Sequence, residues 1–280
     1  MWCGASRPDD GRPQIEHEVL KKRRARFVTP PVNTTLTRAF GRPHVFLPVF
    51  HFTRAVPPLE SLALLVGAGA HGVFLINQGA TVDEVLAWAR TFHERYPSLW
   101  VGVNLLGLSP LAALSALRAA DLLQVVRGLW TDHAGLGWEG DPRAPRITVP
   151  RATTEFAKAI RETGLLHFGG VAFKGQRVVP PAAYGPLATQ AAHVLDVVTT
   201  SGPATGEPPD LPKIQTFADA LRGLPTQASL GIASGMCLDN LGDYLPHAQA
   251  FLVASGIERD FGVFDPVAVR AVRAKIEAGA

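Results

Sequence analysis

The chain has 280 residues, of which 47% are hydrophobic and 18% charged, and its formal net charge is +3. This composition supplies ample apolar side chains for a buried core and argues against a globally disordered protein. The length suits either one large α/β barrel or two medium-sized domains.

A basic run, Lys21-Lys22-Arg23-Arg24-Ala25-Arg26, supplies much of the positive excess. Short basic clusters can bind nucleic acid or an acidic membrane surface, although a solvated helix face or arm is the commoner explanation. Because the rest of the chain is close to neutral, we expect no nucleic-acid partner.

The cysteine content and the apolar stretches bear on location. Cys3 and Cys237 are the two cysteines, which gives no disulfide framework and fits a reducing compartment. The first residues lack the apolar core of a secretory signal, and the longest apolar stretches, such as residues 62–70, are too short to span a bilayer. We therefore expect a cytoplasmic protein without a transmembrane segment.

Short runs rich in Val, Leu, Ile and Phe alternate with stretches of helical period from about residue 44 onward, a pattern typical of repeated βα units. Thr81 with Glu84 predicts a capping box, and Asp210 is an expected N-cap residue. The expected strands are 44–50, 72–76, 100–105, 122–126, 168–173, 194–200, 229–233 and 250–254. The expected helices are 59–66, 81–95, 109–120, 154–163, 187–193, 210–224 and 265–278.

Eight such units predict an α/β fold, a single (β/α)8 TIM barrel over residues 41–280 with a partly irregular N-terminal arm at 1–40. The strands are continuously apolar, as expected for a parallel sheet covered on both faces. A doubly wound open sheet would show the same alternation. We favour the barrel because the count reaches eight and no Gly-x-Gly-x-x-Gly follows the first strand.

The turns after the last two strands are rich in Ser and Gly, and barrels commonly bind phosphate at this place. Small residues let backbone N–H groups approach an anion, and serine hydroxyls can donate to it. Either motif alone could be a plain tight turn, but the two at consecutive strand ends favour a phosphate site. The residues are Ala233, Ser234, Gly235, Ala254, Ser255 and Gly256.

The turn after the sixth strand packs hydroxyls and glycines beside those two corners. It could line the same ligand, although it also serves as a rigid, proline-bounded connection into the next helix. Its candidate ligand contacts are Thr200, Ser201, Gly202, Thr205 and Gly206.

Residues 201–210, the run Ala233-Ser234-Gly235 with Asp239-Asn240, and the run Ala254-Ser255-Gly256 resemble the BtpA/SgcQ family. The resemblance extends more weakly over about 44–280, where it includes Thr131-Asp132 and Lys174. It implies a TIM barrel related to phosphate-binding barrels, in a family linked by name to photosystem I biogenesis and without a settled chemical activity.

The chain departs from that family at two acidic positions. Family members generally have a Glu-Asn pair after the second strand and an Asp before the lysine of the fifth strand. This chain has Asn77-Gln78 and Gly170 there. The missing carboxylates argue against a metal or acid–base role shared with the family.

Three ionisable residues at strand ends are candidate catalytic groups. Asp132 and His133 could serve as general acid or base, because a carboxylate can orient a neighbouring imidazole, although a solvated loop pair is an equal alternative. Lys174 could reach the barrel mouth for Schiff-base or phosphate contact, or form a salt bridge with a loop.

Other polar residues end strands without being obvious acids or bases. Asn77 and Asn104 could bind a polar ligand, and Arg127 is a permanent cation suited to an anion. His51 is a weaker candidate of the same kind, whereas Asp196 should lie at the opposite face, since it precedes most of the sixth strand.

These observations predict an enzyme that binds a small phosphorylated metabolite, such as a sugar phosphate or nucleotide-like compound. Isomerase, lyase and phosphoribosyl transferase activities are all compatible with the pattern. The alternative is a non-enzymatic assembly or regulatory factor that binds a ligand or partner protein. No metal motif or cofactor is evident, and a homo-oligomer is left open.

Overall fold

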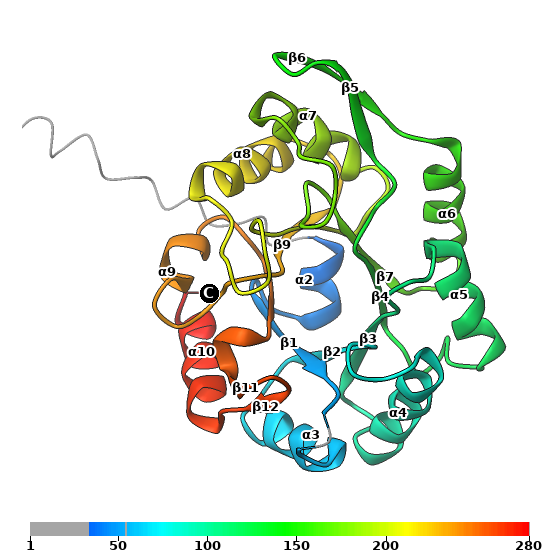
Figure 1. Ribbon diagram of the computed structural model, residues 1–280, viewed down its shortest axis with the longest axis vertical. Coiled ribbons are helices and arrows are strands. Elements are labelled where there is room, and N and C mark those ends of the chain that lie inside the picture. Colours follow the sequence, from blue (N-terminus) through cyan, green and yellow to red (C-terminus); the bar gives the residue numbers. More distant parts are fainter. Residues whose placement is uncertain (1–33, 54, 280) are drawn as a thin grey trace, which may run out of the picture.

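The computed structural model describes residues 34–53 and 55–279, so the basic run and Cys3 lie outside the described residues. Eight parallel strands close into a barrel in which β1 pairs with both β2 and β10, and helices surround it (Figure 1). Closure confirms the predicted TIM barrel, because an open sheet would leave two strand edges unpaired. The barrel strands are β1 (Val45–His51), β2 (Gly72–Ile76), β3 (Trp100–Asn104), β4 (Gly128–Thr131), β7 (Leu166–Gly170), β8 (Val197–Thr200), β9 (Ser229–Ile232) and β10 (Ala250–Val253).

Helices follow the barrel strands, and two short hairpins extend the loops after β4 and β10. Within the described residues, no helix has both the length and the apolar character needed to cross a bilayer. The helices are α2 (Thr35–Phe40), α3 (Pro58–Gly67), α4 (Val82–Arg95), α5 (Pro110–Ala119), α6 (Arg151–Arg161), α7 (Pro181–Ala191), α8 (Leu211–Arg222), α9 (Leu241–Tyr244), α10 (Pro266–Ala278) and the 3₁₀ turn η1 (Ser255–Ile257). The hairpins are β5 (Gly137–Asp141) with β6 (Ala144–Thr148), and β11 (Glu258–Asp260) with β12 (Val263–Phe264).

Helix α2 covers the end of the barrel where the strands begin, although it lies in the range assigned from sequence to the arm (Figure 1). Thr34 caps it in a capping box with Thr37, and Leu36 is fully buried among side chains of the barrel interior. The hydroxyl of Ser229, at the start of β9, donates to Thr34 Oγ1 at 2.7 Å. The described part of the arm is therefore integral to the barrel.

Aromatic rings fill the barrel interior. The ring of Phe74 lies 5.2 Å from that of Trp100 and 4.9 Å from that of Phe168, both edge-on. A Cβ atom on Gly128 would lie 2.6 Å from the Trp100 ring, so this glycine gives the indole its space. The barrel below its rim is thus a packed core, as expected for eight strands.

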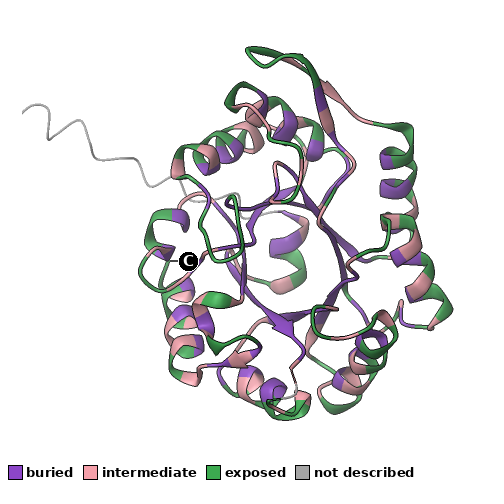
Figure 2. Cartoon of the chain, in the orientation of Figure 1, coloured by how far each residue is buried: buried purple, intermediate pink, exposed green. Residues whose placement is uncertain are grey.

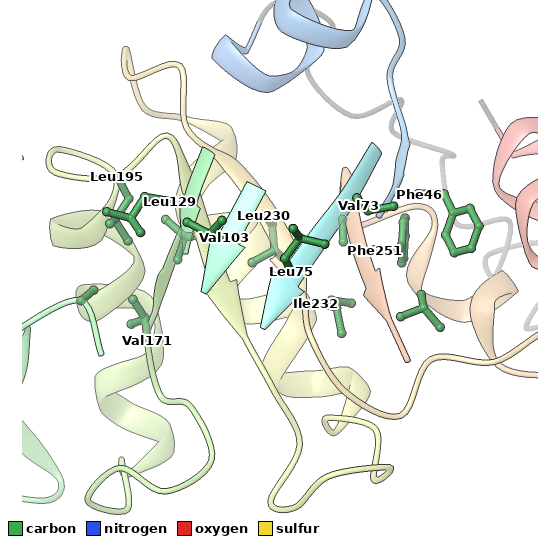
Figure 3. Close-up of a cluster of buried hydrophobic side chains, with 14 of the residues drawn as sticks. Phe46, Val73, Leu75, Val103, Leu129, Val171, Leu195, Leu230, Ile232 and Phe251 are labelled. Carbon is green, nitrogen blue, oxygen red and sulfur yellow. The ribbon is translucent and has the colours of Figure 1, made fainter. Parts of the chain in front are cut away.

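A second apolar layer lies between the strands and the helices. Side chains alternate along each strand, so Phe46 of β1 faces the helices while Val45 and Leu47 face the barrel interior. All seven residues of β1 are buried, as the strands of Figure 2 show. Figure 3 shows part of this layer, with Phe46, Val73, Leu75, Val103, Leu129, Val171, Leu195, Leu230, Ile232 and Phe251 labelled.

The prediction of a strand at 122–126 is wrong. That segment is a turn in which the N–H of Val126 donates to the carbonyl of Leu122, and both side chains are fully buried. Its apolar residues pack against the core from a turn, so their composition resembles that of a strand. The fourth strand is Gly128–Thr131, and the β5–β6 hairpin follows it before α6.

The fifth barrel strand begins earlier than predicted, at Leu166 rather than Phe168. His167 interrupts the apolar run, yet it is 2% exposed and packs edge-on against Phe156 of α6, with ring centroids 5.0 Å apart. The start of this strand was missed because His167 is polar although it is buried against a helix.

Candidate functional site

The corners after β9 and β10 lie against each other at the rim. The place where Gly256 would carry a Cβ is occupied by the backbone carbonyl of Met236, so only glycine permits this approach. The side chain of Ser234 is nearly buried, whereas Ser255 is exposed. The two predicted anion-binding corners therefore converge at one place.

The loop after β8 covers the first of these corners. The N–H of Gly202 donates to Ser234 Oγ at 2.8 Å, and the Ser234 hydroxyl donates to the carbonyl of Glu207, also at 2.8 Å. The hydroxyl that we expected to donate to an anion is thus bonded to its own chain. In the part of the chain that the structure describes, the N–H groups of Ser234 and Gly235 donate to no partner.

The remaining residues predicted in the loop after β8 divide into two groups. Thr200 and Ser201 are buried, and Ser201 Oγ accepts the N–H of Lys174 at 2.8 Å, so both support neighbouring backbone. Thr205 is exposed and its hydroxyl accepts from Lys174 Nζ at 3.0 Å. A Cβ on Gly206 would lie 3.7 Å from Ser255 Oγ, which places Gly206 beside the corner after β10.

Asp132, after β4, and Lys174, after β7, lie near enough at the rim for their charges to influence each other, although they form no ion pair in the described structure. Asn104 Nδ2 donates to Asp132 Oδ1 at 2.8 Å. Burial raises the pKa of Asp132, which the Asn104 hydrogen bond and the positive charge of Lys174 partly offset. Burial lowers the pKa of Lys174, which the charge of Asp132 partly offsets. The pKa of each group is thus shifted towards neutrality, as in many acid–base sites.

A buried indole lies next to this pair. Trp130 pairs with Asn104 in the β3–β4 register, and its ring lies edge-on to Phe173, with centroids 6.0 Å apart. Trp130 is 5% exposed, and its Nε1 finds no acceptor among the described residues. Since a buried donor without a partner is costly, this N–H is a candidate contact for a ligand or water oxygen.

A groove adjoins the pair on its outer side, between the loops after β7 and β8. Its volume is about 500 Å³, and Lys174 lines it. Lys213 of α8 also lines it and donates to the carbonyls of Ala172 and Ser201, each at 2.7 Å. Burial lowers the pKa of Lys213 to about 8. The groove is therefore open beside Lys174, whereas neither Asp132 nor the corners after β9 and β10 line it.

Three other predicted contacts lie elsewhere. The side chain of Asn77 exchanges two hydrogen bonds with the backbone of Leu106, and that of His133 is exposed and accepts the N–H of Gly135. The prediction that Arg127 ends a strand is wrong, because it precedes β4 and so lies at the barrel end opposite the rim.

Some residues of the rim escaped sequence reasoning. Glu258 follows β10 and pairs with His51, whose Nδ1 lies 3.1 Å from Glu258 Oε1, with both side chains buried. Phe261 of the β11–β12 hairpin stacks on the His51 ring at 4.6 Å. An acidic residue after a strand was the available signal, but its partner is 207 residues away in the chain.

Asp196 lies where we expected it, before β8 and away from the rim. Its carboxylate accepts the N–H of His167 at 2.8 Å. It therefore joins the starts of two strands and takes no part in the candidate site.

No protein-family model matches the chain, and no curated protein sequence does. Solved structures do match it over most of its length. Phosphoribosyl anthranilate isomerase from Thermus thermophilus has a TM-score of 0.55 and 16% identity, over 84% of this chain and 98% of that one. Thiamine phosphate pyrophosphorylase from Pyrococcus furiosus has a TM-score of 0.55 and 16% identity, over 85% of this chain and 96% of that one.

Tryptophan synthase subunit alpha from Legionella pneumophila gives a TM-score of 0.56 at 12% identity, over 87% of this chain and 96% of that one. At such identities the likeness shows the TIM-barrel fold alone. The resemblance to the BtpA/SgcQ family therefore stays a prediction.

Proposed function

We propose that this protein is an enzyme that binds a small phosphorylated metabolite at the rim of its barrel and transfers a proton there. The proposal depends above all on the pair formed by Asp132 and Lys174, in which burial raises the pKa of the acid and lowers that of the base. Environments that move two titratable groups towards neutral pH are typical of acid–base catalysis.

In this proposal Asp132 exchanges the proton and Lys174 stabilises negative charge that develops on the substrate. The phosphate lies at the corners after β9 and β10, where the N–H groups of Ser234 and Gly235 are free in the described chain. The rest of the substrate lies towards the groove beside Lys174. Isomerase, lyase and phosphoribosyl transferase reactions all suit this arrangement.

Names of structural neighbours support the phosphate part of the proposal. Phosphoribosyl anthranilate isomerase and thiamine phosphate pyrophosphorylase are both named after phosphorylated compounds, and one isomerase structure contains a deoxyribulose 5-phosphate ligand. The Ser-Gly corners and the loop after β8 also support membership of the BtpA/SgcQ family.

A second candidate is a ligand-binding factor without catalysis, and Gly170 favours it. The space where a Cβ of residue 170 would lie is filled by the backbone carbonyl of Asp132, so the family's aspartate does not fit at this position. Asn77, at the other position where this chain departs from the family, is hydrogen-bonded to the backbone of Leu106. The loss of both carboxylates fits a barrel that binds a ligand without converting it into a product.

A thermal-shift screen of sugar phosphates and nucleotides, followed by mass spectrometry of the incubated mixtures, tests both candidates. We expect a phosphorylated compound to raise the melting temperature, its dephosphorylated counterpart to have little effect, and a product mass to accumulate. Stabilisation without product would favour the binding factor. If no phosphorylated compound stabilises the protein, the phosphate site is wrong.

A further inference from the structure

Gln176 joins the strand-end loops that carry the two charged groups. Its Nε2 donates to the backbone carbonyl of Asp132 at 2.7 Å and to that of Gly170 at 3.0 Å. Its Oε1 accepts the N–H of Phe173 at 3.2 Å. One side-chain amide thus uses both donor hydrogens and its acceptor on backbone directly beside Asp132 and Lys174.

The loop between β7 and Gln176 turns sharply. Ala172 adopts a left-handed conformation with φ 48°, which costs free energy for a residue with a Cβ. This turn directs Phe173 inward, where it is 4% exposed against Trp130, and brings the next residue, Lys174, to Thr205. A loop that adopts an unfavourable backbone conformation needs bonds that hold it there.

Other bonds support the loop from the side of β8 and α8. Ser201 Oγ accepts the N–H of Lys174, and Lys213 Nζ donates to the carbonyl of Ala172. These contacts fix Lys174 relative to β8. Among the side-chain hydrogen bonds of the described residues, those of Gln176 are the ones that join this loop to the backbone of Asp132.

We propose that Gln176 is a positioning residue that sets the spacing between Asp132 and Lys174. The inference rests on the proposed function for its meaning, because this pair is the proposed acid–base centre. No other side chain of similar length has the same bonding pattern: leucine has no polar group, and ionised glutamate would bring its charge against two carbonyl oxygens. Gln176 touches the backbone and not the substrate, so its effect is on geometry.

The test is a double-mutant cycle that measures the interaction between the two charges. The pKa of Asp132 is followed by carboxyl-carbon NMR in the wild type, K174M, Q176L and the double variant. In the wild-type background we expect K174M to raise the pKa of Asp132, since a nearby cation is removed. In the Q176L background the same substitution should change that pKa clearly less, because the charges have separated.

The matched control is R177M, in the same loop. Arg177 lies over the Trp138 ring at 4.1 Å and donates to the Trp138 carbonyl, so it anchors the loop to the β5–β6 hairpin and not to Asp132. In this background K174M should act as in the wild type. Equal coupling in the Q176L and R177M backgrounds would overturn the proposal and leave Gln176 a general support of the loop.

A shorter amide provides a variant that retains polarity. Q176N keeps the donors and acceptor on a side chain one methylene shorter, and is expected to give a coupling between those of the wild type and Q176L. If Q176L is unfolded by circular dichroism, Q176N decides, and wild-type coupling in it counts against the proposal. No ligand is needed in these measurements, so failure of metabolite binding would contradict the proposed function without bearing on Gln176.

Discussion

The hydroxyl of Ser234 donates to the carbonyl oxygen of Glu207 at 2.8 Å, and these residues belong to two different loops of the rim. Because the same hydroxyl accepts the N–H of Gly202, it ties both ends of the loop after β8 to the corner after β9. An anion at this corner would then be bound by backbone amides rather than by the serine hydroxyl.

The substitution S234A is therefore expected to destabilise the protein. Removing the hydroxyl leaves the buried N–H of Gly202 without its acceptor, which costs about 1–3 kcal/mol. Urea unfolding followed by circular dichroism measures the change. The exposed Ser255, changed to alanine, should alter stability by less than about 0.5 kcal/mol. Equal stability of the two variants would contradict a stabilising role for the Ser234 hydroxyl between the loop after β8 and the corner after β9.

The substitution D132N is expected to reduce turnover of whichever metabolite the screen identifies by about 10²–10⁴-fold, the usual contribution of a positioned acid or base. The fold should remain, since an asparagine oxygen can still accept from Asn104. Steady-state kinetics measures the loss. As a control, D141N changes an exposed carboxylate on the β5–β6 hairpin and should leave turnover intact. Retained turnover in D132N would exclude Asp132 as the proton-transfer group.

Acid should destabilise the protein through His167. Burial lowers the pKa of His167 from 6.5 to about 4, so between these pH values the unfolded chain binds a proton that the folded chain does not. The stabilising contribution is present above pH 6.5 and is lost as the pH falls, by about 3 kcal/mol near pH 4. Urea unfolding at several pH values measures it, and H167L should flatten this part of the profile. An unchanged profile in H167L would assign the acid sensitivity to other groups.

The substitution G128A should disrupt the barrel interior. A methyl group at this position would lie 2.6 Å from the Trp100 ring, and overpacking of a core typically costs about 1–3 kcal/mol. The matched control is G67A in α3, where an added Cβ meets no atom within 4 Å and alanine is the better helix former. Thermal unfolding compares them, and a fully stable G128A would show that the interior can repack.

The fold could be predicted largely from local sequence patterns. Apolar runs identified most barrel strands, and Thr81 with Glu84 forms the expected capping box at the start of α4. The fourth strand was misplaced because Leu122 and Val126 are as apolar as a strand but pack from a turn. Nothing local distinguishes these two cases, since the deciding contacts come from distant parts of the chain.

The candidate site could be predicted only in part from the sequence. Asp132 and Lys174 follow strands, and a barrel brings strand ends to one rim, so their meeting could be expected. Their partners could not be, because the bonds of Gln176 and Lys213 depend on how individual loops fold back. The same reason explains Ser234, whose pattern is that of an anion donor while its hydroxyl is bonded within the chain.

Aromatic rings packed edge-on fill the interior of the barrel, and α2 covers the end at which the strands begin. Among the described residues, a compound bound at the rim as proposed would therefore enter and leave through the open side of the rim and not along the barrel axis. In the proposed function, product would then leave by the route on which substrate arrives, so a bulky chemical label attached beside the exposed Thr205 should obstruct both steps at once.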